Sequence, residues 1–209
     1  MECYMCEAQA NTREHVPPKA FFPGGCRQNL ATVPSCETHN HAHSLDIEYV
    51  RNLIAGFYGV NAQGELVFEA AKRSYDRSPA LFNRTFHDFD TVRFAGDETA
   101  KFTVDLERMK AVMRPIAHAV YFADFGRRFE PQWNVFVASM RSREDLAGLP
   151  SQWQPFRDLL ATLQFVPRKV PYPEIFTYGI HQMDGGLVYR FVFYGSFRVH
   201  CFGPSKEFR

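Results

Sequence analysis

Two pairs of metal-binding residues near the N-terminus place the strongest constraint on the fold of this chain. Cys3 and Cys6 are separated by two residues, and Cys36 and His39 repeat that spacing about thirty residues later. A two-residue gap lets a tight turn direct both side chains at one ion, so the two pairs together predict a closed, structural zinc site. Such a site can hold a short segment in a fixed shape although its apolar core is small.

The other cysteines fit this interpretation. Cys26 follows two glycines in an expected loop and is an alternative ligand to Cys36 or His39, whereas Cys201 lies in an apolar stretch and is expected to be a core thiol. The five cysteines are an odd number, and two of them form a ligand-spaced pair, which favours metal-bound thiolates in a reducing compartment over disulfides. We therefore expect a cytoplasmic protein.

The residues between the two pairs predict a hairpin. Residues 12–16 and 30–34 read as short strands, and the prolines and glycines between them indicate a long loop. A helix is expected from near His39 to about Phe57. Its apolar face would carry Leu45, Val50, Leu53 and Ile54. A hairpin followed by a helix, with zinc at their junction, is a ββα unit, which we assign to residues 1–58.

Residues 59–209 predict a second region, which makes the whole chain a member of the α+β class. A turn-rich stretch at 59–64 marks the boundary. Helical patterns cover 65–77, 104–125 and 151–163, and Pro115 is expected to kink or split the second of them, while Ser151 is expected to cap the third. Strands are expected at 87–94, 133–140, 175–181, 187–193 and 196–202, with a hairpin turn at 183–186.

Charge and hydropathy exclude some classes of function. No apolar run reaches the ~20 residues of a membrane helix, and no secretory signal is visible. The net charge is only +1, and residues 1–55 carry four Lys and Arg against six Asp and Glu, so bulk charge does not indicate a nucleic-acid binder. Phosphate contacts would need local pairs such as Arg127-Arg128 or Arg168-Lys169, which solvated charge explains equally well. The C-terminal phenylalanines could stack bases, but their alternate spacing is more typical of a core face.

The order of these N-terminal motifs resembles that of the HNH endonucleases, the ββα-metal or His-Me finger group. The sequence has Cys3-x2-Cys6, then Glu14-His15, then Asn29-Leu, then Cys36-x2-His39-Asn40. This order is similar to the zinc-bearing, treble-clef members of that group in the His-Asn-Asn version of the motif. The resemblance covers roughly residues 1–55, and it implies a metal-dependent nuclease with a structural zinc ion.

The resemblance also implies a role for each motif residue. His15 would be the general base that takes a proton from water, and Asn29 would orient it by holding the hairpin loop. Asn40 would help to hold a catalytic Mg²⁺ or Mn²⁺ ion, together with Glu14, and that ion would bind the scissile phosphate. The substrate implied is double-stranded DNA. Strand alternation directs Glu14 and His15 to opposite sides, so a bulge or a strand end is needed for both to serve one site.

The helix after the second ligand pair departs from the family pattern. His39 stands where Cys is commoner, and Ser44 stands where a second helical metal ligand is often a histidine. His41 and His43 are each offset from that position, and we interpret His43 as a surface residue. Glu48 shares a helix face with Asn40, and is either a further ligand of the catalytic ion or a solvated residue. The histidines of the second region lack ligand spacing and are expected to be ordinary core or surface residues: His87, His118, His181 and His200.

A second function remains open at this point. The low positive charge and the incomplete helical ligand set favour, as the alternative, a non-catalytic zinc module joined to an α+β domain that binds a partner or nucleic acid. A catalytic zinc enzyme such as a deaminase needs three protein ligands, an open position and a nearby Glu, so a four-ligand site argues against it. The sequence predicts no membrane contact, and it leaves both a homodimer and a regulatory partner protein open.

Overall fold

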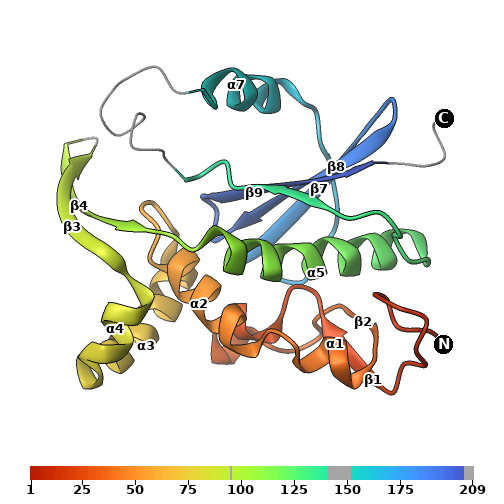
Figure 1. The fold of residues 1–209 in the computed structure, drawn as a ribbon, viewed down its shortest axis with the longest axis horizontal. Coiled ribbons are helices and arrows are strands. Elements are labelled where there is room, and N and C mark those ends of the chain that lie inside the picture. The colour runs from red at the N-terminus through yellow and green to blue at the C-terminus, as the bar shows by residue number, and fades with distance from the viewer. Residues whose placement is uncertain (95, 141–151, 205–209) are drawn as a thin grey trace.

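The N-terminal residues form the predicted hairpin and the start of the predicted helix. The computed structural model describes residues 1–94, 96–140 and 152–204 (Figure 1). Strands β1 (Thr12–His15) and β2 (Thr32–Ser35) pair antiparallel, with Thr12 opposite Ser35 and His15 opposite Thr32. The long loop between them contains two 3-10 turns, η1 (Lys19–Phe21) and η2 (Gly24–Cys26). Helix α1 (Glu37–His41) follows directly, so the β-β-α order of residues 12–41 is confirmed.

The helix predicted from His39 to Phe57 is wrong in one respect, because it is broken in two. Helix α1 ends at His41, and α2 (Ser44–Ala55) begins after His43, whose φ of −130° and ψ of 23° lie outside the helical region. Leu45, in the first turn of α2, has 76% of its surface exposed, contrary to its predicted place on the apolar face. The buried face of α2 consists of Tyr49, Val50, Asn52, Leu53, Ile54 and Ala55.

The next elements form an arm at one end of the molecule (Figure 1). Helix α3 (Ala62–Arg77) and strand β3 (His87–Phe94) confirm the predicted helix at 65–77 and strand at 87–94. Helix α4 (Pro79–Thr85) and strand β4 (Asp97–Thr103), which pairs antiparallel with β3, were not predicted. The arm has a small core of its own, made of Ala71, Tyr75 and Phe86.

Helix α5 (Leu106–Phe125) lies between the N-terminal unit and the C-terminal sheet (Figure 1). Asp105 caps its first turn and Gly126 ends it in the left-handed conformation that favours glycine, with φ at 67°. Of the kink or split expected at Pro115, the split does not occur, because one helix runs through this residue. Helix α5 is buried on several sides, so the free energy of its packing outweighs the one backbone hydrogen bond that Pro115 cannot donate. The buried residues of α5 are Met109, Val112, Met113, Ile116, Ala117, Ala119, Val120 and Tyr121.

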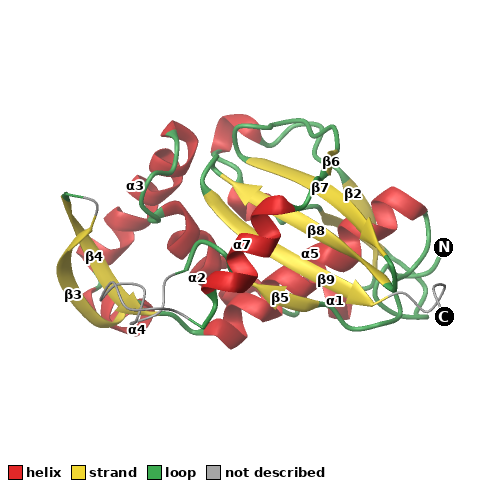
Figure 2. Cartoon of the chain, turned by 90° about the horizontal axis from the view of Figure 1, so that it is seen from above, coloured by secondary structure: helices red, strands yellow, loops and turns green. Residues whose placement is uncertain are grey.

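A five-stranded antiparallel sheet forms the C-terminal layer, in the order β5-β9-β8-β7-β6. Its strands are β5 (Asn134–Phe136), β6 (Val166–Pro167), β7 (Phe176–Met183), β8 (Gly186–Phe193) and β9 (Phe197–Pro204). The strands predicted at 175–181, 187–193 and 196–202 are thus confirmed, while the one predicted at 133–140 is shorter. Helix α5 covers one face and helix α7 (Gln154–Thr162) the other (Figure 2). The predicted cap of α7, Ser151, lies outside the described residues, and Trp153 occupies the N-cap position.

One hydrophobic core joins the two predicted regions. It contains Val33 and Ile54 of the N-terminal unit, Met113 of α5 and Tyr189 of the sheet. The C-terminal phenylalanines confirm the core interpretation over the base-stacking one, because three of them are fully buried: Phe191, Phe193 and Phe197. Across the described part of the chain, no helix combines the length and the apolar character needed to span a bilayer. The N-terminal unit therefore packs on α5 and the sheet as part of one folded body.

Candidate metal centre and adjoining pocket

The structure brings the four predicted zinc ligands together. The Sγ atoms of Cys3 and Cys6 each lie 3.5 Å from Nδ1 of His39, and the Sγ atom of Cys36 lies 3.2 Å from it. The Sγ atoms of Cys6 and Cys36 are 4.0 Å apart, and all four donor atoms lie within 4.8 Å of one another. A tetrahedral zinc ion with ordinary bond lengths needs sulfur–sulfur distances of about 3.8 Å and sulfur–nitrogen distances of about 3.5 Å. The cluster could therefore hold a structural zinc ion.

Local backbone contacts position these ligands. The turn that carries Cys3 and Cys6 is tied to β2, because the amide of Tyr4 donates to the carbonyl of Pro34 at 2.9 Å. Cys36 is the N-cap residue of α1, and His39 lies one turn into that helix. Cys26 is outside the cluster, with its Sγ atom 4.0 Å from a side-chain oxygen of Gln63, so the alternative ligand is not supported.

The environment of Cys3 favours its metal-binding thiolate form. Burial by itself would raise the pKa of the Cys3 thiol, but hydrogen bonds from the backbone of Met5, Cys36 and Cys6 and from the side chain of His39 outweigh it. Together they lower the pKa from its ordinary value of 9.0 to about 6. The thiolate is the form that binds a metal, so the lowered pKa is compatible with Cys3 as a zinc ligand. Cys201 is fully buried, which confirms it as a core thiol.

A pocket adjoins the Cys and His cluster and lies between the N-terminal unit and α5. It holds about 370 Å³ of empty space, part of it open to solvent. One wall is polar and comes from the hairpin and the two short helices: Glu14, His15, His39, Asn40 and His43. The opposite wall is the apolar face of α5: Ala111, Val112, Pro115, Ile116 and Ala119. His39 belongs both to the cluster and to the pocket, so the two sites share a side chain.

Glu14 and His15 both line this pocket, although they are neighbours on one strand. Strand β1 ends at His15, so the alternation that would separate the two side chains stops there. Burial raises the pKa of the Glu14 carboxyl from 4.5 to about 7, against a smaller opposing effect of a hydrogen bond with the His15 backbone. Burial, with a smaller contribution from the charge of Lys19, lowers the pKa of His15. His15 is therefore a neutral imidazole at neutral pH, which is the form that can accept a proton.

The other predicted site residues divide into two groups. Asn40, which is partly buried on α1, lines the pocket with Glu14 and His15. Asn29 is exposed in the loop between the strands, with a left-handed φ of 55° that asparagine tolerates, and it is not among the residues that line the pocket. Glu48 also lies outside the lining set, where its carboxylate is 3.7 Å from the guanidinium of Arg51. The structure thus brings three of these five residues together.

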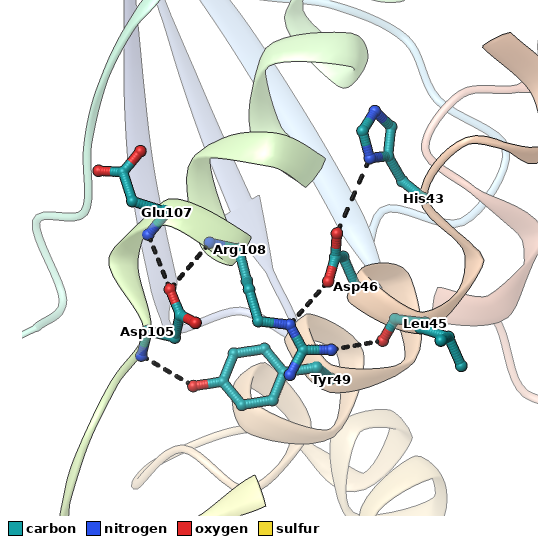
Figure 3. A network of polar contacts seen from close by, with 7 residues as sticks. All are labelled: His43, Leu45, Asp46, Tyr49, Asp105, Glu107 and Arg108. Carbon is teal, nitrogen blue, oxygen red and sulfur yellow. Dashed lines mark hydrogen bonds and ion pairs between the residues drawn. The ribbon is translucent and has the colours of Figure 1, made fainter.

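His43 was predicted to be a surface residue, and 36% of its side chain is exposed, but it also lines the pocket. It sits at the break between α1 and α2, with its Nδ1 atom 3.8 Å from Oδ2 of Asp46 (Figure 3). The second carboxylate oxygen, Oδ1 of Asp46, accepts a 2.7 Å hydrogen bond from Nε of Arg108 on α5. The three-residue spacing of His43 and Asp46 was the available signal, because a helix places such residues on one face.

The two basic pairs considered as phosphate contacts have internal partners. The guanidinium of Arg128 lies 3.3 Å from a carboxylate oxygen of Glu2, and that of Arg168 lies 3.5 Å from a carboxylate oxygen of Asp124. Asp124 also accepts 3.0 Å hydrogen bonds from the hydroxyls of Tyr178 and Tyr189. These ion pairs thus support the interpretation of the two basic pairs as ordinary charges at the ends of helices and strands, rather than as phosphate contacts.

Comparison with known proteins gives no relative from which a function could be transferred. Neither the protein-family models, nor the curated proteins, nor the solved structures contain a match to this chain. The functional argument therefore depends on the geometry of the cluster and the pocket.

Proposed function

We propose that this protein is a metal-dependent endonuclease of the HNH type, with its N-terminal unit in the treble-clef arrangement, that hydrolyses phosphodiester bonds in DNA. One observation carries the proposal: Glu14, His15 and Asn40 line a single pocket beside a closed Cys and His cluster. The resemblance of the N-terminal motifs assigns catalytic roles to these same three residues. Their convergence is what that hypothesis requires, because a catalytic group must lie within reach of the atom on which it acts.

In this proposal each side chain has a separate task. His15, neutral at neutral pH, takes the proton of the attacking water. Glu14 and Asn40 supply oxygen atoms of the kind that Mg²⁺ and Mn²⁺ prefer. Such an ion, when bound, would neutralise charge on the scissile phosphate and stabilise the leaving oxygen. The structural zinc ligands hold the hairpin against α1, and His39 links that support to the pocket wall.

The test is nicking of a supercoiled plasmid in the presence of Mg²⁺, Mn²⁺, Ni²⁺ or Zn²⁺. We expect the wild-type protein to cut, and His15→Ala to lose at least about 10²-fold in rate while it keeps its zinc. His41→Ala is a matched control, because His41 is exposed on the same short helix and does not line the pocket. Single-stranded DNA and RNA substrates define the strand requirement. Intact plasmid with every metal ion, or equal cutting by wild type and His15→Ala, contradicts the proposal.

The alternative is a non-catalytic zinc module fused to a partner-binding or nucleic-acid-binding domain. The apolar wall that α5 presents to the pocket favours it, because apolar side chains offer no positive charge to a phosphodiester backbone. Binding of Mn²⁺, measured by electron paramagnetic resonance, separates the two functions. A Mn²⁺ site that Glu14→Gln abolishes supports the nuclease, and no such site in the zinc-loaded protein supports the module.

A further inference from the structure

We propose that helix α5 is a positioning element of the pocket, and that it fixes the imidazole of His43 through Asp46 and Arg108. The catalytic consequence rests on the proposed nuclease function, whereas the positioning itself does not. It gives residues 59–209 a role at the N-terminal site, because Arg108 of α5 contacts Asp46, which in turn faces His43 on the polar wall of the pocket (Figure 3).

The contacts run from the pocket to α5 in two steps. His43 lines the pocket, and its Nδ1 atom faces Oδ2 of Asp46 at 3.8 Å, which is beyond hydrogen-bond distance and makes an ion pair only when the imidazole is protonated. Oδ1 of the same carboxylate accepts a 2.7 Å charge-assisted hydrogen bond from Nε of Arg108. Because Arg108 occupies one oxygen, the carboxylate cannot rotate freely, and its other oxygen stays toward His43. This leaves Nε2 as the ring atom of His43 available to a ligand in the pocket.

Two contacts besides the one with Asp46 hold the guanidinium of Arg108. Its Nη2 atom donates a 2.9 Å hydrogen bond to the carbonyl of Leu45, and its guanidinium lies 4.1 Å from the centre of the Tyr49 ring. The hydroxyl of Tyr49 accepts a 2.9 Å hydrogen bond from the amide of Asp105. Asp105 caps α5 by accepting from the amides of Glu107 and Arg108. The first turn of α5 is thus bound to the first turn of α2.

The geometry of this network explains why arginine stands at position 108. A guanidinium can donate to the Asp46 carboxylate and to the Leu45 carbonyl at once while it stacks on Tyr49, whereas a lysine ammonium can satisfy the charge but not this planar arrangement. A side chain that acted only as a surface ion pair would not need the second and third contacts. The exposed ion pair of Lys110 with Glu107, on the same turn of α5, is such a simple pair at 2.7 Å.

The experiment compares Asp46→Asn and Arg108→Lys with the control Glu107→Gln in the full-length, zinc-loaded protein. The first readout is the ¹⁵N chemical shifts of the His43 imidazole at one fixed pH, assigned with His43→Gln. We expect these shifts to change in Asp46→Asn and Arg108→Lys and to stay unchanged in Glu107→Gln. Zinc content and thermal unfolding establish that each variant is folded, and the conservative Arg108→Lys keeps the positive charge in place.

The second readout is the rate of plasmid cleavage. Since Nε2 of His43 is the ring atom that this arrangement leaves to a ligand in the pocket, we expect kcat to fall about 10- to 100-fold in both variants, the usual effect of removing a partner that orients a residue of a metal site, with little change in KM. Wild-type His43 shifts in both folded variants overturn the positioning role. A wild-type protein that cuts no substrate removes the proposed function, but the imidazole shifts still decide whether α5 positions His43.

Discussion

The partly buried carboxyl of Glu14 is expected to lower the stability of the folded protein, and this cost can be measured. Burial raises the pKa of this carboxyl from 4.5 to about 7. A difference of about 2.5 in pKa corresponds to about 3.4 kcal/mol, and we reduce this to about 2 kcal/mol because the residue is only partly buried. Glutamine at position 14 has nearly the same shape and no charge to desolvate. We therefore expect Glu14→Gln to be more stable than the wild-type protein by about 2 kcal/mol at pH 8 without a second divalent ion.

The sign of this effect depends on pH. Between pH 4.5 and 7 the folded state binds more protons at Glu14 than the unfolded state, so the wild-type protein loses stability as the pH rises through this window. The gain from Glu14→Gln should be near zero at pH 4.5, grow up to pH 7 and then stay constant. Urea unfolding of both proteins at several pH values measures it, and the difference between them cancels the protons released by the zinc ligands.

Two further measurements make this test specific. Glu37→Gln alters an exposed carboxylate on α1, and it should give no stabilisation at pH 8, because a negative charge in the first turn of a helix is favourable. Added Mn²⁺ should stabilise the wild-type protein at pH 8 more than Glu14→Gln, since an ion that binds only the folded state raises its stability. If Glu14→Gln gains nothing at pH 8, or gains equally at pH 4.5 and pH 8, the carboxylate is not desolvated and the reasoning is wrong.

Two other predictions concern the metal centre and the core. Cys36→Ser should lose zinc, measured with a chromogenic chelator, and should unfold at much lower urea, whereas Cys26→Ser should keep both properties; equal zinc content in the two variants contradicts the ligand assignment. Burial, with smaller effects of the Arg190 and Arg198 charges, lowers the pKa of His200 to about 4, so the folded state binds fewer protons there and stability is lost as the pH falls from 6.5 toward 4. His200→Phe should reduce that acid loss by up to about 3 kcal/mol. It should also remove, at every pH, the cost of two buried ring nitrogens that have no hydrogen-bond partner among the described residues. An equal loss of stability in acid for the variant and the wild-type protein contradicts this.

The parts of the fold that the sequence predicted are those that local patterns determine. The two-residue gaps between Cys3 and Cys6 and between Cys36 and His39 let local backbone geometry direct each pair at one point. The structure brings these four residues together as expected. Strands β7 and β8 alternate around a glycine-containing turn, so their pairing is encoded within twenty residues. Strand β4 and helix α4 were missed because their sequences lack a strong apolar periodicity, and they are stabilised by contacts within the arm.

The candidate site could be predicted only in part, for a physical reason. Glu14, His15 and Asn40 were singled out because the order of the N-terminal motifs resembles that of the HNH endonucleases, and the structure brings these three residues to one pocket. His43 was interpreted as a surface residue because it is offset from the helical position where the family pattern often has a second metal ligand, and the structure places it at the break between α1 and α2, where it lines the pocket. Such breaks depend on how the following helix packs, which single-sequence periodicity does not report.

The sequence by itself determined the four candidate metal ligands, the hairpin between them and the position of Glu14 and His15 at the end of its first strand. These features are short-range, since they follow from turn geometry and strand length. Tertiary structure decided what closes the pocket and what holds His43, because α5 reaches both from more than sixty residues away along the chain. Contacts over that separation are selected by the packing of the common core, and no local pattern in either segment specifies them.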